Sequence, residues 1–154
     1  MKRIKDLALI KLKEKHPNFP DHALPIPKYS DKTANGLTKS IVDFLNLSSH
    51  QAERISTTGR YIDNSIVVTD VLGRQRTIGS GKYIPGNSTK GSADISATIK
   101  GMSVKIEVKM KDKQSEYQKK YQKNIEDAGG QYWLVHSFDE FIIYYDKFLI
   151  NFAK

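Results

Sequence analysis

The stretch GSADISATIKGMSVKIEVK, which runs from Gly91 to Lys109, alternates polar and apolar residues on both sides of Lys100-Gly101. Such alternation around a short turn is typical of a β-hairpin. If Lys100 and Gly101 form a two-residue turn, the apolar residues of the two strands lie opposite one another. The expected apolar pairs are Ile99 with Met102, Ala97 with Val104, Ile95 with Ile106 and Ala93 with Val108. A shift of one residue would mix the two faces, so burial of the apolar face selects this pairing.

The opposite face of the expected hairpin carries two carboxylates. The same pairing places Asp94 opposite Glu107, and like charges at directly opposed positions destabilise a sheet. Two carboxylates that close either share a proton or bind a cation, and Mg²⁺ prefers one or two carboxylates completed by water and phosphate. Lys109 lies two residues beyond Glu107, on the same strand face. This set predicts metal-assisted hydrolysis of a phosphodiester. The alternative is a half-buried strand with a solvated charged face.

The flanking sequence predicts further helices and short strands. Apolar spacing predicts helices over 2–15, Thr33–Asn46 and 115–128, and a last helix opened by the capping-box spacing of Ser137 and Glu140. Strands are expected within 50–57, on both sides of Leu72-Gly73 and over 131–136. A proline-rich connector is expected over 16–31 and a loop over 80–91. Tyr117, Tyr121 and Ile125 recur every four residues and are expected on the buried side of their helix.

The order of these elements predicts an α/β fold with a mixed sheet. We expect residues 1–32 to form an N-terminal helix and connector, and residues 33–154 to form the main domain. The chain of 154 residues carries 25 Lys and Arg against 17 Asp and Glu, a net charge of +8. This excess favours a polyanionic partner such as nucleic acid, with plain solubility as the alternative. The chain has no cysteine, which excludes disulfides and thiolate metal sites, and no stretch is long enough to span a membrane. A cytoplasmic protein without a membrane partner is expected.

The acidic residues and their neighbours resemble a known motif. Gly91-Ser92-Ala93-Asp94, a spacer of twelve residues and then Glu107-Val108-Lys109 resemble the PD-(D/E)xK nuclease superfamily. The finer features are similar to its VRR-NUC branch, the virus-type replication-repair nucleases. These features are Ile106-Glu107-Val108-Lys109, Ser115-Glu116-Tyr117-Gln118, Ala128-Gly129-Gly130 and the earlier Arg54 and Gly59. The resemblance covers roughly residues 33–140.

The resemblance implies a restriction-endonuclease-like αβββαβ core and DNA cleavage that depends on Mg²⁺ or Mn²⁺. Asp94 and Glu107 would bind the metal together with the Val108 carbonyl, Lys109 would be the catalytic lysine, and Gln118 would support the site. Ser115-x-x-Gln118 is also a capping-box pattern, which by itself would explain both residues.

Relatives often carry a further metal-binding glutamate early in the first core helix. Thr33–Asn46 has none, with Asn35 nearest the expected place and Asp43 near its end, so a one-metal mechanism is expected.

The resemblance and the charge together imply DNA as the partner. Bacterial and phage members resemble Holliday-junction resolvases, which implies branched DNA as the preferred substrate, a homodimer, and a phage or mobile-element origin. Expected DNA contacts are Arg54, Arg60, Arg74, Arg76, Lys82, Lys111, Lys113 and Lys119. Arginines on turns and edge strands favour phosphate contacts over base readout. Two alternatives stay open: a non-catalytic nucleic-acid-binding module on a nuclease-like scaffold, and a phage interaction protein whose acidic pair is vestigial.

Overall fold

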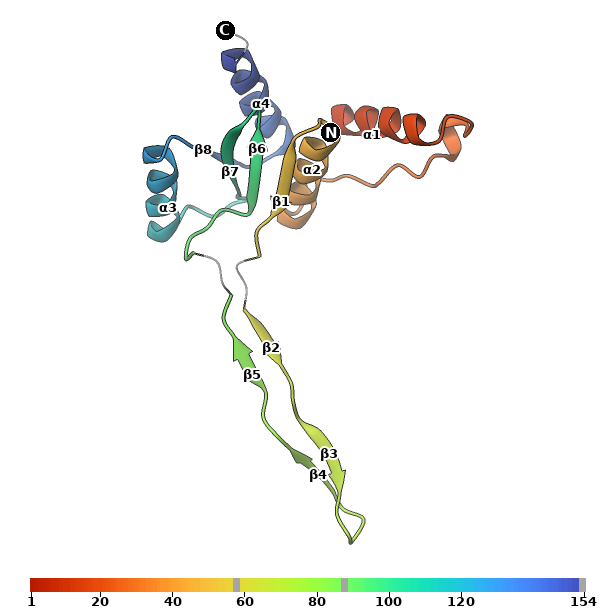
Figure 1. The fold of residues 1–154 in the computed structure, drawn as a ribbon, viewed down its shortest axis with the longest axis vertical. Coiled ribbons are helices and arrows are strands. Elements are labelled where there is room, and N and C mark those ends of the chain that lie inside the picture. Colours follow the sequence, from red (N-terminus) through yellow and green to blue (C-terminus); the bar gives the residue numbers. More distant parts are fainter. Residues whose placement is uncertain (57–58, 87–88, 153–154) are drawn as a thin grey trace. The chain divides into compact units, whose positions relative to one another are not determined.

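The computed structural model describes residues 1–56, 59–86 and 89–152, which form two compact units (Figure 1). The first unit combines Met1–Ile55 with Lys90–Lys154, and the second is Ser56–Thr89. The first unit contains α1 (Lys2–Lys15), a 3₁₀ turn η1 (Asp21–Ala23), α2 (Ala34–Leu47), β1 (Gln51–Arg54), β6 (Ile95–Ile99), β7 (Met102–Val108), α3 (Glu116–Asp127), β8 (Gln131–Val135) and α4 (Phe138–Phe152). The second contains β2 (Arg60–Ile62), β3 (Ile66–Thr69), β4 (Gln75–Ile78) and β5 (Lys82–Ile84). The predicted helices are confirmed to within about two residues.

A four-stranded mixed sheet with the order β1-β6-β7-β8 forms the centre of the first unit. β1, β6 and β7 are antiparallel, and β8 runs parallel to β7 after the crossover through α3. The predicted hairpin pairing is confirmed from Ile95–Ile106 to Ile99–Met102. Lys100 and Gly101 both have positive φ angles, of 51° and 82°, as a type I′ turn requires. The burial argument therefore identified the register correctly.

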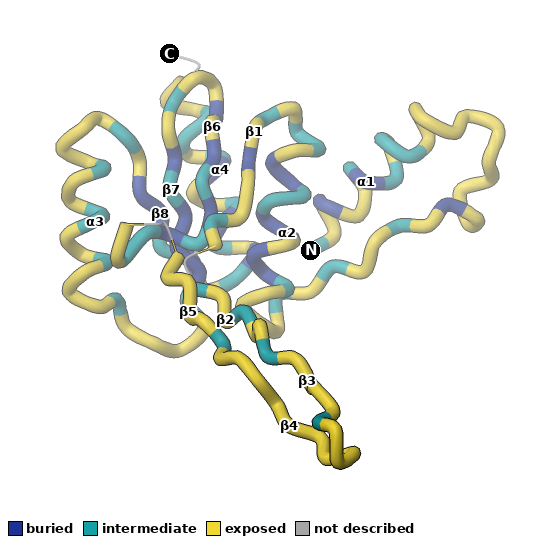
Figure 2. The backbone as a smooth tube through the Cα atoms, turned by 60° about the horizontal axis from the view of Figure 1, so that its bottom comes forward, coloured by how far each residue is buried: buried dark blue, intermediate teal, exposed yellow. Residues whose placement is uncertain are grey.

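The apolar face of this sheet packs on helices. Ile95, Ile99, Val104 and Ile106 are fully buried, and Figure 2 shows the buried positions concentrated on β6, β7, β8 and α2. α2 and α4 cover this face with aromatic side chains, among which Phe44 packs edge-on against Phe138, Phe141 and Tyr145. α3 contacts β8 from the other side, where the Tyr121 and Tyr132 rings lie 6.4 Å apart. The fold is therefore a mixed sheet flanked by helices.

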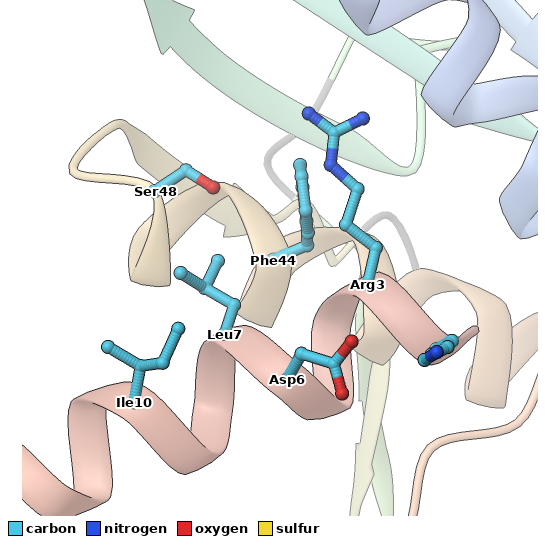
Figure 3. A pocket seen from close by; sticks show the side chains of 7 residues that line it. Arg3, Asp6, Leu7, Ile10, Phe44 and Ser48 are labelled. Carbon is cyan, nitrogen blue, oxygen red and sulfur yellow. The ribbon is translucent and has the colours of Figure 1, made fainter.

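The first helix packs on this core through its N-terminal half. Ile4 is fully buried, and Arg3 donates two hydrogen bonds of 2.9 and 2.8 Å to the Asp146 carboxylate of α4. A pocket between α1 and α2 is lined by Leu7, Ile10 and Phe44 together with polar residues that include Arg3 and Asp6 (Figure 3). None of the expected site residues lines this pocket. No described helix combines the length and the apolar character needed to cross a membrane.

The second unit is a two-stranded ribbon, named here the ribbon and comprising residues 59–86. β3 pairs with β4 around the predicted turn at Leu72-Gly73, and β2 pairs with β5. The loop expected over 80–91 was wrong for Lys82–Ile84, which form β5. The Gly and Ser residues around β5 indicated a loop. The strand has only three residues, and its partner β2 is separated from it in the sequence by β3 and β4. Thr57, in the expected strand within 50–57, lies outside the described residues.

Candidate active site

Asp94 stands immediately before β6, where the polypeptide leaves the hairpin ladder. Its main-chain carbonyl accepts a hydrogen bond from Ile55 N (2.8 Å), which ties it to the chain beyond β1. Its carboxylate Oδ2 accepts a hydrogen bond from Val108 N (2.9 Å). This bond engages one of the two Asp94 oxygens and places the carboxylate beside the residue that follows Glu107. The predicted pair of Asp94 with Glu107 lies beyond the ladder, which ends at Ile95–Ile106, but Asp94 is near enough for its charge to act on Glu107.

Glu107 is a buried carboxylate with an incomplete set of partners. Its side chain is 3% exposed, and Oε1 accepts from Gln118 Nε2 (2.5 Å) and from Lys109 Nζ (3.2 Å). Oε2 is buried without a hydrogen-bond partner in the described part of the chain. Burial, and then the charge of Asp94, raise the pKa of Glu107, while Lys109 lowers it in part. An ionised carboxylate in this position lacks compensation at one oxygen, which is a costly arrangement unless a further partner binds there.

Lys109 is held close to Glu107 from the end of the same strand. Its side chain is 16% exposed, and its main-chain N–H donates to Val135 O (2.9 Å). This bond continues the parallel pairing of β7 with β8 by one residue beyond Val108. Strand alternation and the pairing with β8 together therefore determine the position and direction of the Lys109 side chain.

Gln118 combines the two roles that its sequence pattern left open. Its Oε1 accepts a hydrogen bond from Ser115 N (2.9 Å), and the Ser115 hydroxyl accepts one from Gln118 N (3.3 Å), so the predicted capping box is present. The amide nitrogen of the same side chain donates to Glu107. The start of α3 is therefore connected directly to the buried acid.

Gly91 allows α3 to approach the hairpin closely. Its φ angle is +86°, and a Cβ at this position would lie 2.5 Å from the Tyr117 carbonyl oxygen and 2.9 Å from Gln118 N. A side chain here would therefore push the first turn of α3, with Gln118, away from Glu107.

We expect Gly91→Ala to lower the free energy of unfolding by about 1–3 kcal/mol, because it adds both backbone strain and this clash. Urea unfolding measures the loss. Gly101→Ala is the matched control, since Gly101 has a similar φ of +82° but no atom within 4 Å of its would-be Cβ. Equal losses in the two variants would contradict the proposed contact with α3.

Two residues of this region carried no functional prediction. Tyr132, on β8, is paired with Lys105 of β7, and burial followed by the Glu107 charge raises the pKa of its hydroxyl. Lys105 donates to the Ser96 hydroxyl (2.6 Å) across the hairpin. The only available signal was strand alternation, which places Lys105 and Glu107 on one face.

Tyr117 was expected to be buried, which is wrong: it is 54% exposed, and Lys90 Nζ lies 3.8 Å from its ring centroid.

The carboxylate of α2, Asp43, lies beside the Tyr29 phenol. Asn35 accepts a hydrogen bond from Arg54 Nη2 (2.8 Å). Burial, and then Asp43, raise the pKa of Tyr29 to about 12, so Asp43 lies beside that phenol. Across residues 1–56, 59–86 and 89–152, no group of three or more His, Cys, Asp or Glu side chains is arranged to hold a metal ion. A divalent ion at Asp94 and Glu107 would need ligands other than side chains of these types.

The residues expected to contact DNA are divided between the two units. Arg60, Arg74, Arg76 and Lys82 are exposed on the ribbon. Lys111 and Lys113 are exposed between β7 and α3. Lys119 forms an exposed ion pair with Glu116 at 2.7 Å, and such surface pairs contribute little energy. Arg54 is also exposed, and its Nη2 donates a hydrogen bond to Asn35.

Comparisons with known proteins add no relative: no protein-family model, no curated protein and no solved structure matches this chain.

Proposed function

We propose that this protein is a metal-dependent endonuclease that hydrolyses phosphodiester bonds in DNA, with branched DNA as its preferred substrate. The observation that carries the proposal is the buried Glu107 carboxylate, whose Oε2 has no described partner although Asp94 lies next to it. A divalent cation satisfies this oxygen and offsets the repulsion between the acids. The chain order α2, β1, β6, β7, α3 and β8 supports the proposal, because it is the order of an αβββαβ core.

The donor set fits Mg²⁺ or Mn²⁺. Asp94 and Glu107 supply two carboxylates, and the carbonyl of Val108, the residue after Glu107, is the proposed third ligand. Hard divalent ions commonly bind through one or two carboxylates and complete their shell with water and substrate phosphate. The bound ion would polarise the scissile phosphate and lower the pKa of a coordinated water. With two carboxylates available, one metal is proposed.

The chain's own residues then have separate roles. Glu107 must be ionised to bind the cation, and Gln118 holds its Oε1 in place through the amide N–H. The Lys109 ammonium lies 3.2 Å from the same oxygen, so it is positioned to orient a water molecule. It also provides positive charge near the phosphate as negative charge develops in the transition state.

DNA as the substrate is supported by charge and by the architecture. The net charge of +8 favours binding to phosphates. Outside the ribbon, the part of the chain that the structure describes has no obvious module for reading a long base sequence, so recognition of DNA structure is proposed. Two copies of this small chain would reach both strands of a junction, so we propose a homodimer as the active form.

The test is a cleavage panel on linear duplex, flap, fork and four-way junction DNA with Mg²⁺, Mn²⁺ or EDTA. We expect cleavage with either metal, none in EDTA, and the fastest cleavage on branched substrates. Tight binding to junctions without cleavage in either metal would overturn the proposal in favour of a binding module. Equal cleavage of linear and branched DNA would overturn only the substrate preference.

The cap at Ser115 and the contact of Gln118 with Glu107 predict different results for two variants. Ser115→Ala removes the hydroxyl cap and is expected to cost about 1 kcal/mol of stability, but it leaves the Gln118–Glu107 hydrogen bond in place. Gln118→Ala keeps the main-chain N–H that the Ser115 hydroxyl caps but removes the side-chain hydrogen bonds to Ser115 N and to Glu107. It is expected to lower the cleavage rate by about tenfold or more, since one charge-stabilising hydrogen bond is lost. Thermal unfolding and single-turnover cleavage separate the two effects. If Ser115→Ala slows cleavage as much as Gln118→Ala, the contact with Glu107 has no role of its own.

A further inference from the structure

The ribbon exposes apolar side chains on both of its faces. Large apolar residues exposed on it are Tyr61, Ile66, Val67, Val68, Val71, Leu72, Ile78, Tyr83 and Ile84, and Figure 2 shows β3 and β4 exposed along their whole length. Apolar patches of this kind usually mark a surface that binds a partner. A two-stranded ribbon is also only marginally stable alone in water. The ribbon therefore has the character of a binding element.

The turn at the tip of the ribbon exposes two apolar side chains in an ordered conformation. Val71 and Leu72, between β3 and β4, are 102% and 72% exposed. Asp70 organises this turn, because its Oδ1 accepts hydrogen bonds from Leu72 N and Arg74 N (2.9 Å each) and its carbonyl accepts one from Gly73 N (2.9 Å). A turn held by three hydrogen bonds presents two apolar side chains with little conformational entropy left to lose on binding.

The charges of the ribbon favour a polyanion as the partner. Its four cations, Arg60, Arg74, Arg76 and Lys82, are exposed. Its two acids are engaged internally: Asp63 accepts from Ser65 N (2.9 Å), and Asp70 holds the tip and lies 3.8 Å from Arg76. A second copy of this ribbon would bring like charges together, whereas nucleic acid supplies the opposite charge.

Two tyrosine rings lie against two glycines at the base of the ribbon. Gly59-Arg60-Tyr61-Ile62 recurs in form as Gly81-Lys82-Tyr83-Ile84, and the two segments pair with Tyr61 opposite Tyr83. A Cβ on Gly81 would lie 1.7 Å from the Tyr61 hydroxyl oxygen, and one on Gly59 would lie 2.2 Å from that of Tyr83. Each ring therefore lies over the glycine that precedes the opposite strand.

We propose that the ribbon is a DNA-contacting arm whose Val71–Leu72 tip inserts at the branch point of the substrate, while Arg74 and Arg76 contact the flanking phosphates. The proposal rests on the proposed function in that it takes DNA as the partner. Bases at a branch point have lost a stacking neighbour, so an apolar side chain covers them without the cost of unstacking an intact step, which is a few kcal/mol. The tip would thus recognise DNA structure without reading base edges.

The test uses the full-length protein in EDTA with four-way junctions and linear duplexes that carry 2-aminopurine at the branch point or at mid-duplex. The wild-type protein is expected to raise the fluorescence at the branch point and to bind the junction about tenfold more tightly than the duplex. Val71→Ser/Leu72→Ser should lose both effects and keep duplex binding, because its arginines remain. Ile143→Ser/Ile150→Ser is the matched control, since these α4 residues are 54% and 60% exposed; it should behave as wild type.

Two results would overturn the proposal. One is a Val71→Ser/Leu72→Ser variant with unchanged fluorescence response and junction preference. The other is a variant that converts a dimer to a monomer, by light scattering, with junction binding unaltered, which would make a second copy the partner of the tip. Failure of the nuclease function is distinguishable, because a protein that gives the fluorescence change but never cleaves with Mg²⁺ contradicts only the catalytic proposal. Cleavage with an unaffected tip variant contradicts only the insertion.

Discussion

Glu107→Gln is expected to reduce metal-dependent DNA cleavage by about 10³-fold or more, with DNA affinity changed by less than about threefold. A loss of 10³ corresponds to about 4 kcal/mol of transition-state stabilisation, within the range that a bound metal supplies. The amide is nearly isosteric, and its carbonyl oxygen still accepts from Gln118, so the local fold is preserved. Single-turnover cleavage and filter binding on one junction substrate measure the two quantities. Cleavage within tenfold of the wild-type rate would remove Glu107 from the reaction.

The same variant should be more stable than the wild type when metal is absent. The fold raises the pKa of Glu107 above its ordinary value of 4.5, so folding favours the protonated acid. Stability contributed by that proton is present at low pH and declines as pH rises through the raised pKa. At pH 8 in EDTA, Glu107→Gln removes the disfavoured charge and should raise Tm. Mg²⁺ should then raise the Tm of the wild type but not of the variant, because only the wild type binds it. A lower Tm for the variant in EDTA would contradict the sign of this argument.

Lys109→Ala is expected to produce the largest loss of stability among the site variants. It leaves a buried carboxylate without its cation, which costs about 3–5 kcal/mol when the acid stays ionised. Glu107 escapes part of this cost by taking up a proton, so its pKa should rise further. The loss should therefore be small near pH 5 and large near pH 8, as measured by urea unfolding at both values. Cleavage should fall by about 10²-fold or more, since the cation near the phosphate is removed.

A double variant distinguishes this explanation from a simple packing defect. Lys109→Ala/Glu107→Gln should recover most of the stability lost at pH 8, because the uncompensated charge is gone, while cleavage stays absent. Lys113→Ala, a loss of the same charge at an exposed position, should change stability by less than about 0.5 kcal/mol. A loss in Lys109→Ala that is independent of pH and persists in the double variant would show that the aliphatic stem of Lys109, and not its charge, supports the fold.

The central hairpin was predictable because its register is determined by local alternation. Only one pairing buries Ile95, Ala97, Val104 and Ile106 together, and the structure has that pairing. The helix starts at Thr33 and Ser115 were predictable for a similar reason, since their side chains accept hydrogen bonds from residues within the next turn. These features depend on neighbours in the chain.

The rest of the site depends on contacts that the sequence pattern does not contain. Alternation predicted a charged face on β7, yet Glu107 is buried and accepts a hydrogen bond from Gln118 of α3. The absence of a side chain at Gly91 leaves room for that turn of α3. Gln118 is a second example. Its spacing from Ser115 indicated a helix cap, but only the packing of α3 against the hairpin brings its Nε2 to Glu107. β5 was not predicted because a strand of three residues is too short to show an alternating pattern in the sequence, and its partner β2 is not adjacent to it in the chain.

The parallel pairing of β7 with β8 has a consequence for how the protein is made. Lys109 is anchored by the carbonyl of Val135, and β8 is synthesised only after the whole of α3. A nascent chain that has emerged as far as the hairpin carries both acids but lacks the neighbour that orients the lysine. Because such long-range pairings form late in folding, the arrangement of Asp94, Glu107 and Lys109 is completed together with the last quarter of the polypeptide.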